Sequence, residues 1–598
     1  MAALRKHVPA AVAAGLTVAA LAGAVPAAAG ADADAEVSRV VVATTDEQAA
    51  ERVNRALRTH GAARVQPLKV VNGFAADVPA SYVPSLRRLP GVRSVTVDSR
   101  LRLMSTEPGL DVGNPGSLAA ISRIVNADRA WEAGVTGQGV DVALIDSGIS
   151  PVQGLTSGNV VNGPDLSFES QSPALTRLDT FGHGTHMASI IAGRDAVASG
   201  AAYAADTASY KGIAPDSRIV SVKVADHSGA TDVSQVIAGI DWVVQHRRDN
   251  GLNIRVMNLS FGTDSTQWYR IDPLSFAVEN AWRKGIAVVV AGGNNGRDTG
   301  SLANPAQDPY VIAVGASDSN GTKNVLDDTV PAFSSRGSST RYVDVVAPGV
   351  SVHGLRNPGS AIDQQFPSAR SGERFFKGTG TSQAAAVVSG SAALLLSRYP
   401  SLTPDQVKKH LMDTATPFDG AGVRGRGQGV VNVRRAVATA PPSQYASAQT
   451  WGAGTGTGSL EASRGSYHVG DSTSQLTGEI DIFGNAFDSA AWAAATSSGN
   501  AWSGGTWNGA AWSGNAWSSD DWTGNAWSGA AWSGNAWSGN AWSDESWAGH
   551  AWSGASWTGA AWSGSAWSGA AWSGAAWSGA SWTGASWLGS AWSSSSWE

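Results

Sequence analysis

The sequence predicts an α/β fold for residues 118–440, a mostly parallel sheet with helices on both faces. Short Val/Ile/Ala runs bounded by glycine recur there, as in strands buried on both faces. These runs are VDVALID (140–146), SRIVSVKV (217–224), IRVMNLS (254–260), GIAVVVAGG (285–293), YVIAVGAS (310–317) and YVDVVAPG (342–349). Between them, residues 233–250 and 275–285 have helical periodicity. In such folds the chemistry lies at the carboxyl ends of the strands.

The composition limits the kinds of site that the chain can carry. There are no cysteines, which excludes disulfides, thiolate metal sites and a cysteine nucleophile. The formal net charge of −6 gives no reason to expect a nucleic-acid partner.

The first residues have the features of an export signal. A basic start at residues 5–7 precedes a run of small apolar residues, and A-x-A patterns at 27–29 and 29–31 fit signal peptidase cleavage. We predict a signal peptide over residues 1–31 and a secreted, extracellular protein. Pro26 interrupts the apolar run, which makes a permanent membrane anchor the weaker interpretation.

Residues 36–105 predict a small α+β unit. Strands are expected at 37–44, 69–79 and 92–103, an amphipathic helix at 47–61 and a short helix at 81–89. A stretch containing Pro and Gly, STEPGLDVGNPGS, then separates this unit from the α/β domain.

Three strand-to-helix junctions carry residues suited to catalysis. Asp146 follows the strand in ALIDSGI, His183 lies between two glycines in DTFGHGTHMASIIAG, and Ser382 follows a Gly-Thr-Gly-Thr turn in KGTGTSQAAAVVSG. Each residue also has a structural interpretation. Asp146 could cap a helix or lie in a turn, His183 could be a structural histidine, and Ser382 could cap a helix. Their joint occurrence in the order Asp, His, Ser favours a nucleophilic triad.

These segments resemble the subtilisin-like serine protease family (subtilases). The matching stretches are VALIDSGI (142–149), GHGTHMA (182–188), NLSFG (258–262), AGGNNG (291–296), VAPG (346–349), GTSQAAAVVSG (380–390) and GQGVVNV (427–433). The resemblance covers residues 118–440 and implies a subtilisin-like peptidase domain. It implies a serine-type endopeptidase, a hydrolase that acts on proteins or peptides.

The resemblance also implies a role for each matching residue. Ser382 would attack the scissile carbonyl, His183 would act as general base and acid, and Asp146 would orient the imidazole. Asn294 matches the family's oxyanion-hole asparagine. Two segments would form walls of the primary specificity pocket, although their glycines could equally serve only to relieve strand crowding: Ser260, Phe261, Gly262, Ala291, Gly292 and Gly293.

Two positions depart from the family pattern near the nucleophile. Gln383 stands where Met is common, so oxidation of a thioether is not available there. Ala386 stands where Pro is usual, and DSG replaces the commoner DTG at Asp146. None of these changes removes a catalytic group.

Residues 36–105 resemble the family's ferredoxin-like inhibitory prodomain through VNGFAADVPASYVPSLRRLPGVRSVTVD (71–98). The resemblance implies a zymogen that carries its own intramolecular inhibitor and is cleaved near 103–117. The alternative is an independent small domain. No cofactor is required for the triad chemistry. A structural Ca²⁺ ion stays open, since loop Asp and Asn residues form no compact ligand motif.

The end of the chain has a different composition. We predict a linker and transition over 441–490 and a Trp-rich pentad-repeat tail over 491–598, with a tryptophan at every fifth position from Trp502 to Trp597. Glycine argues against a helix, which leaves a β-solenoid or disorder. Flat tryptophan rings are suited to contact with a cell wall or a glycan. The alternatives are that they stack on one another inside the tail, or that the tail is disordered. A rival function follows, either cell-envelope adhesion or a tethered processing protease in which the tail carries the main role.

Overall fold

The computed structural model describes residues 37–68, 72–97, 110–111, 113–170, 172, 174–195, 200–296, 300–419, 421–441, 449–469, 475–503, 506–508, 510–511 and 594–596. The chain divides into two compact units, residues 1–99 and 100–598. The predicted signal peptide lies outside the described residues, as do most of the pentads and most of the segment in which zymogen cleavage is expected.

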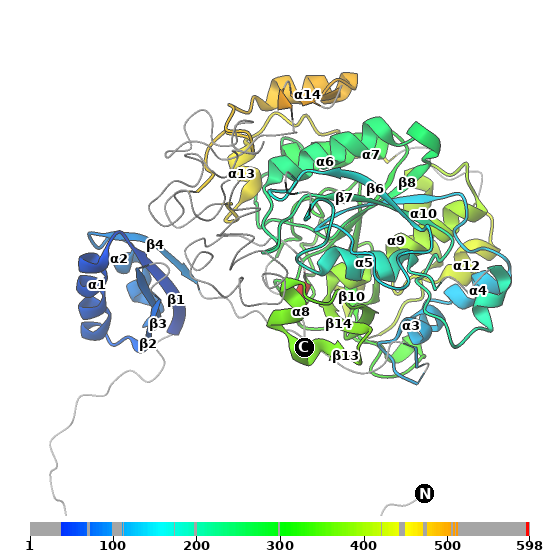
Figure 1. Ribbon diagram of the computed structural model, residues 1–598, viewed down its shortest axis with the longest axis horizontal. Helices are drawn as coiled ribbons and strands as arrows, with labels where there is room; N and C mark the ends of the chain where they lie inside the picture. The colour runs from blue at the N-terminus through cyan, green and yellow to red at the C-terminus, as the bar shows by residue number, and fades with distance from the viewer. Residues whose placement is uncertain are drawn as a thin grey trace, which may run out of the picture. The chain divides into compact units, whose positions relative to one another are not determined.

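The first unit is a four-stranded antiparallel sheet with two helices, in the chain order β-α-β-β-α-β (Figure 1). Its sheet order is β2-β3-β1-β4. The elements are β1 (Val37–Thr44), α1 (Glu47–Thr59), β2 (Ala63–Leu68), β3 (Gly73–Pro79), a 3-10 turn (Ala80–Tyr82), α2 (Val83–Leu86) and β4 (Val92–Val97). This connectivity is that of ferredoxin-like units.

Local sequence explains most of this unit. Asp46 caps α1 by accepting a hydrogen bond from the Ala49 N–H at 2.7 Å, and Val53 and Leu57 bury the apolar face of the helix. The predicted strand 69–79 begins only at Gly73 among the described residues. Sequence analysis missed β2, whose residues are mostly exposed and show no clear alternation.

The second unit contains a seven-stranded parallel sheet in the order β11-β10-β9-β8-β5-β7-β6. Its strands are β5 (Asp141–Asp146), β6 (Val160–Asp165), β7 (Arg218–Lys223), β8 (Ile254–Leu259), β9 (Ala287–Ala291), β10 (Ile312–Ser317) and β11 (Val345–Pro348). The predicted α/β fold is confirmed, and each predicted strand of the domain contains an observed one. Within this sheet only β6 was missed, because this edge strand is partly exposed and lacks a continuous apolar run.

The strand order reverses beside β5, which lies between β8 and β7. In open parallel sheets the loops diverge at such a reversal and leave room for a ligand beyond the carboxyl ends. The topology therefore directs attention to the end of β5 and to its neighbour β8.

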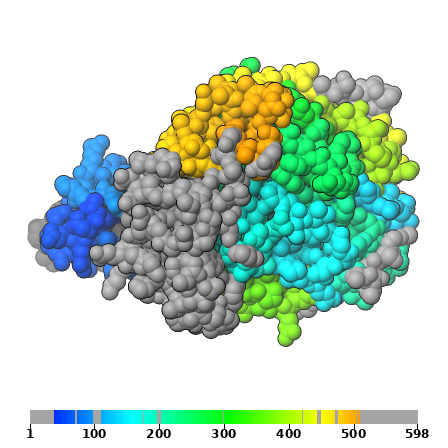
Figure 2. Space-filling view, turned by 45° about the horizontal axis from the view of Figure 1, so that its top comes forward, coloured from blue at the N-terminus to red at the C-terminus, as the bar shows by residue number. Residues whose placement is uncertain are grey.

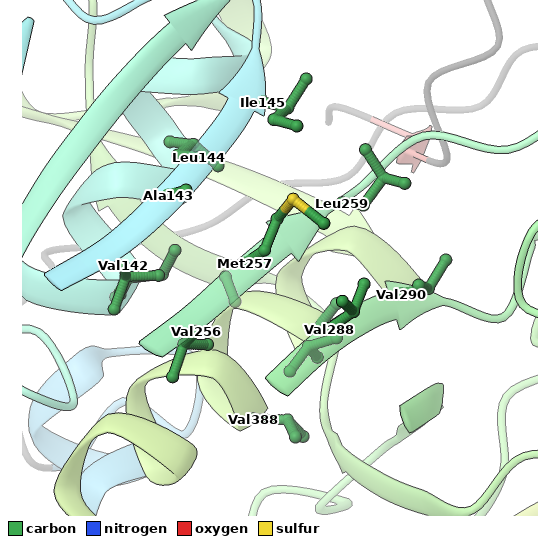
Figure 3. Packing of buried hydrophobic residues seen from close by; sticks show 14 of the residues in the cluster. Val142, Ala143, Leu144, Ile145, Val256, Met257, Leu259, Val288, Val290 and Val388 are labelled. Atoms are coloured by element: carbon green, nitrogen blue, oxygen red, sulfur yellow. The ribbon is translucent and has the colours of Figure 1, made fainter. Parts of the chain in front are cut away.

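Helices pack on both faces of this sheet (Figure 1). One pair, α5 and α9, lies together, and α9 also contacts β8 to β11; α6 and α7 form a second pair. Figure 3 shows the core between strands β5, β8 and β9 and Val388 of α9. The helices are α3 (Leu118–Ile124), α4 (Ala127–Glu132), α5 (His183–Ala192), α6 (Val233–His246), α7 (Pro273–Arg283), α8 (Ala361–Gln365), α9 (Thr381–Arg398), α10 (Pro404–Thr414), α11 (Gly422–Arg426) and α12 (Val433–Ala438).

A small antiparallel sheet leads into α9 through its strand β14. It consists of β12 (Val352–Leu355), β13 (Arg370–Ser371), β14 (Phe375–Gly380) and β18 (Ser594–Ser596). Strand β18 belongs to the predicted tail, and its backbone pairs with Thr379 and Gly380 at the end of β14.

Described parts of the predicted linker and transition (441–490) and of the first part of the predicted tail (491–598) are folded against the domain. Residues 449–511 form α13 (Leu460–Arg464), α14 (Ser489–Ser498), β15 (Trp502–Ser503), β16 (Thr506–Trp507) and β17 (Ala510–Ala511). Their atoms, yellow to orange in Figure 2, lie against the green part of the chain, and α13 and α14 contact α6 and α7.

Buried polar contacts explain why this segment is ordered. Arg464 is fully buried and donates through Nε to Oδ2 of Asp232 at 2.7 Å, at the first turn of α6. The indole N–H groups of Trp492 and Trp507 both donate to Oδ2 of Asp241, at 2.9 Å and 2.6 Å. Composition alone indicated a linker followed by a repeat tail, but these long-range contacts hold Arg464 of the first segment and Trp492 and Trp507 of the second against α6.

Within the described part of the chain, no helix is both long and apolar enough to cross a bilayer.

Candidate active site

Asp146 is the last residue of β5, at the reversal of the strand order. Its side chain is buried, and Oδ1 accepts a hydrogen bond from the N–H of Ser147 at 2.8 Å. Gly148 follows with φ of +101°, a conformation that favours glycine. The sharp turn holds the carboxylate at the carboxyl edge of the sheet.

His183 is the first residue of α5, and the two glycines beside it have different roles. Gly182 precedes the helix with φ of +110°. Gly184 allows close approach, because a Cβ there would lie 2.1 Å from the backbone oxygen of Gly148. The GHG sequence thus lets the first turn of α5 pack directly on the turn after Asp146.

This packing brings the two side chains together. Nδ1 of His183 lies 2.8 Å from Oδ1 and 3.0 Å from Oδ2 of Asp146, and both residues are buried. A carboxylate at Nδ1 fixes the tautomer that carries its proton there, which leaves Nε2 to act as a base.

Ser382 is the second residue of α9, which β14 enters directly. Gly380 holds the N-cap position and no side chain caps this helix, so Ser382 is not a helix cap. Its Oγ lies 3.5 Å from the backbone oxygen of Ser260. Helices α5 and α9 pack together with their first turns at the carboxyl edge of the sheet, which brings the elements that carry His183 and Ser382 to the same place.

Asn294 lies just beyond β9 and is anchored to Thr381, the residue before Ser382. Its Oδ1 accepts hydrogen bonds from the N–H of Thr381 at 2.9 Å and from the Thr381 hydroxyl at 3.0 Å. Its Nδ2 is buried and has no hydrogen-bond partner among the described residues. The amide is therefore oriented with its donor end available.

The predicted pocket residues come from neighbouring strands. Leu259 of β8 pairs with Val290 of β9, so the segments 260–262 and 291–293 emerge side by side. Among their glycines, Gly292 allows close approach, because a Cβ there would lie 2.9 Å from the backbone oxygen of Val314. At Gly262 a Cβ would lie 2.8 Å from that of Ala303. These contacts agree with relief of crowding between neighbouring strands.

Sequence analysis missed two groups next to the triad motifs. Asp179 is buried four residues before His183, and its Oδ1 accepts a hydrogen bond from Ser147 Oγ at 2.8 Å. Thr381 holds Asn294 as described above. Both precede a predicted catalytic residue by a few positions, but only their long-range partners distinguish them from turn residues.

His186 lies one turn after His183, with its ring against β12. A Cβ at Gly354 would lie 2.6 Å from its Nδ1. Burial, with smaller effects from His183 and His353, places the pKa of His186 well below its usual range, so this side chain is neutral. Across the described ranges, no three His, Cys, Asp or Glu side chains form a cluster that could hold a metal ion.

Comparison with known proteins identifies relatives for the second unit. The subtilase family model (Peptidase_S8) matches residues 137–445. Serine protease AprX of Bacillus subtilis is 38% identical over 309 residues, which cover 51% of this chain and 67% of that protein. Subtilisin DY of Bacillus licheniformis is 34% identical over 315 residues, 52% of this chain and 96% of that protein.

Among solved structures, fervidolysin from Fervidobacterium pennivorans aligns with a TM-score of 0.43 and 23% identity, over 69% of this chain and 63% of that chain. The family model covers more than half of the sequence and includes all three motifs and Asn294. The chain belongs to the subtilase family and is a serine endopeptidase.

Proposed function

We propose that the protein is a secreted subtilisin-like endopeptidase, made as a zymogen, that cleaves proteins or peptides with Asp146, His183 and Ser382 through an acyl-enzyme. Asn294 completes the site as an oxyanion donor. The observation that carries the proposal is the buried pair of contacts between His183 Nδ1 and the Asp146 carboxylate, on a helix packed against the one that presents Ser382.

The chemistry follows from the roles of these groups. Ser382 Oγ attacks the scissile carbonyl while Nε2 of His183 takes its proton, and the imidazolium then delivers that proton to the leaving amine. Asp146 stabilises the imidazolium and remains ionised. Water repeats the sequence to release the acyl group.

Charge on the tetrahedral intermediate needs donors that are already in place. The Nδ2 group of Asn294 and the N–H of Ser382 are suitable, because Asn294 is held by Thr381 and Ser382 lies in the first turn of a helix. The start of α9 therefore holds both donors: it supplies the N–H of Ser382, and its Thr381 orients the Asn294 side chain.

Residues 36–105 would act as the intramolecular inhibitor that is removed on maturation. The compact β-α-β-β-α-β unit supports a prodomain that folds by itself, since it has its own core. Parallel sheets with long connections fold slowly, which gives such a unit a use as a folding aid.

The rival function depends on tryptophans that are free to meet a partner. Three tail tryptophans are described, Trp492, Trp502 and Trp507, and all are buried. Trp492 and Trp507 donate to Asp241 of α6. For this part of the tail, the contacts support internal packing rather than glycan adhesion.

Active-site labelling tests the proposal. We expect a fluorophosphonate probe to label the secreted protein only after loss of the N-terminal unit, as read from the mass of the labelled species, and not to label S382A. A folded, processed protein that fails to react would overturn the proposed triad. Digestion of casein at many sites would support general proteolysis, whereas a single cleavage would favour a processing role.

A further inference from the structure

A second buried carboxylate lies behind the Asp146–His183 pair. Asp179 is 2% exposed and precedes α5. Its Oδ1 accepts hydrogen bonds from Ser147 Oγ at 2.8 Å and from the N–H of Gly182 at 2.6 Å. Its Oδ2 accepts from the N–H of Thr185 at 2.8 Å. One side chain therefore binds both the turn after β5 and the first turn of α5.

These two segments carry the two residues whose geometry matters most. Ser147 directly follows Asp146, and its Oγ also lies 3.3 Å from Asp146 Oδ1. The same Oγ accepts a hydrogen bond from the N–H of Gly184, next to His183, at 2.9 Å. Since a hydroxyl has one proton, the shorter contact indicates that Ser147 donates it to Asp179 rather than to Asp146.

We propose that Asp179 is a positioning residue for catalysis, which, with Ser147, fixes the Asp146 carboxylate relative to the His183 ring. This inference rests on the proposed triad. A further hydrogen bond joins the loop after β5 to the first turn of α5: the N–H of Ser150 donates to the Thr185 hydroxyl at 3.0 Å. The backbone oxygen of Asp179 also accepts from the Asn357 amide.

Asp179 also adds negative charge close to the imidazole. Burial raises the pKa of Asp179, while the hydrogen bonds that it accepts from Thr185, Gly182 and Ser147 act in the opposite direction and favour the ionised form. The titratable groups that surround it are Asp146 and His183, on the two segments that it joins, and the buried Lys223 of β7, which interacts electrostatically with Asp179. Lys223 is already paired with Glu169 at 2.5 Å. Loss of the Asp179 charge should therefore make the His183 imidazolium less stable.

The test compares D179N with a matched control, D165N. Asparagine has the same shape, but its NH₂ group must face one of the donors on either side of it. Asp165 is also buried and also accepts from a hydroxyl and backbone N–H groups, those of Ser167 and Arg177, but none of its contacts reaches α5 or Asp146. Comparison of the two variants therefore distinguishes misplacement of the Asp146 carboxylate and the His183 ring from the general effect of losing a buried carboxylate.

We expect kcat of D179N to fall about 10- to 100-fold with little change in KM, since small displacements of catalytic groups cost this much. The acidic limb of its kcat/KM profile should move to lower pH. S147A should show a smaller loss that S147T restores, and D165N should keep the wild-type kcat and pH profile. Wild-type kinetics for D179N, or equal losses in D165N, would overturn the assignment. Labelling of S382A by a fluorophosphonate would instead overturn the triad itself.

Discussion

Oδ1 of Asn294 accepts a hydrogen bond from the N–H of Thr381 at 2.9 Å, which fixes the amide beside the residue that precedes Ser382. The acceptor end of the amide is therefore used, and Nδ2 has no partner in the described part of the chain. A donor held in this way can stabilise an oxyanion without reorganising.

The first prediction concerns this donor. N294A should lower kcat on peptide substrates by about 10²–10³, with little change in KM, as for the loss of other oxyanion donors. N295A provides the control, because the neighbouring Asn295 is exposed. Steady-state kinetics of both variants test this prediction. A decrease in the kcat of N294A of less than a few fold would show that Asn294 is not an oxyanion donor.

The second prediction concerns Gln383, which is fully buried and whose two amide atoms have no hydrogen-bond partner among the described residues. An unsatisfied buried amide costs about 1–3 kcal/mol. Q383M should therefore raise the free energy of unfolding, measured with urea. It should also make activity sensitive to peroxide, because a thioether oxidises and an amide does not. Equal peroxide resistance in both proteins would contradict this expectation.

The third prediction concerns the buried ion pair between Arg464 and Asp232. Burial by itself would raise the pKa of Asp232, yet the Arg464 guanidinium holds it below its usual value. R464M leaves that carboxylate buried and unpaired, which should lower the free energy of unfolding by about 3–5 kcal/mol. The double variant R464M/D232N should recover much of the loss, and R434M, at an exposed position, should change little.

The fourth prediction concerns pH. Burial raises the pKa of Asp241 to about 6, although two indoles and Thr496 donate to it. The folded protein then binds this proton more tightly than the unfolded chain, so stability falls as pH rises from about 4 to 6.

Asparagine should remove this pH dependence. Both indoles use the same oxygen, Oδ2, which one amide oxygen can replace. D241N should therefore be more stable than wild type above pH 6, by roughly 2–3 kcal/mol, and equal to it near pH 4. Thermal unfolding of both proteins, measured from about pH 4 to neutral pH, tests this prediction. Lower stability of D241N than of wild type at neutral pH would show that the Asp241 charge itself is needed.

The fifth prediction concerns β18, whose backbone pairs with Thr379 and Gly380, just before Ser382. A peptide bound along this edge of β14 would compete with it. Proline has no backbone N–H, so S594P/S596P in the full chain should raise kcat/KM for long peptides more than for short ones. The same two prolines at Ser573 and Ser578 serve as the control. Unchanged kinetics for the β18 variant would exclude competition.

The sequence by itself determined the fold class and the candidate residues. Strands buried on both faces must be continuously apolar, so β5, β8, β9 and β10 were readable from composition. Asp146, His183 and Ser382 were readable because each lies at a glycine-containing strand-to-helix junction, and because the three occur in the order of a nucleophilic triad.

Only the tertiary structure decided which ordinary residues support the site and where the domain ends. Asp179 looks like a turn residue until Ser147, 32 positions earlier, donates to it. The Gly- and Ser-rich segment after residue 441 looks like a linker until Arg464 meets Asp232, 232 positions away. A buried charge is stable only with its partner, and no local pattern identifies a partner that folding alone brings close.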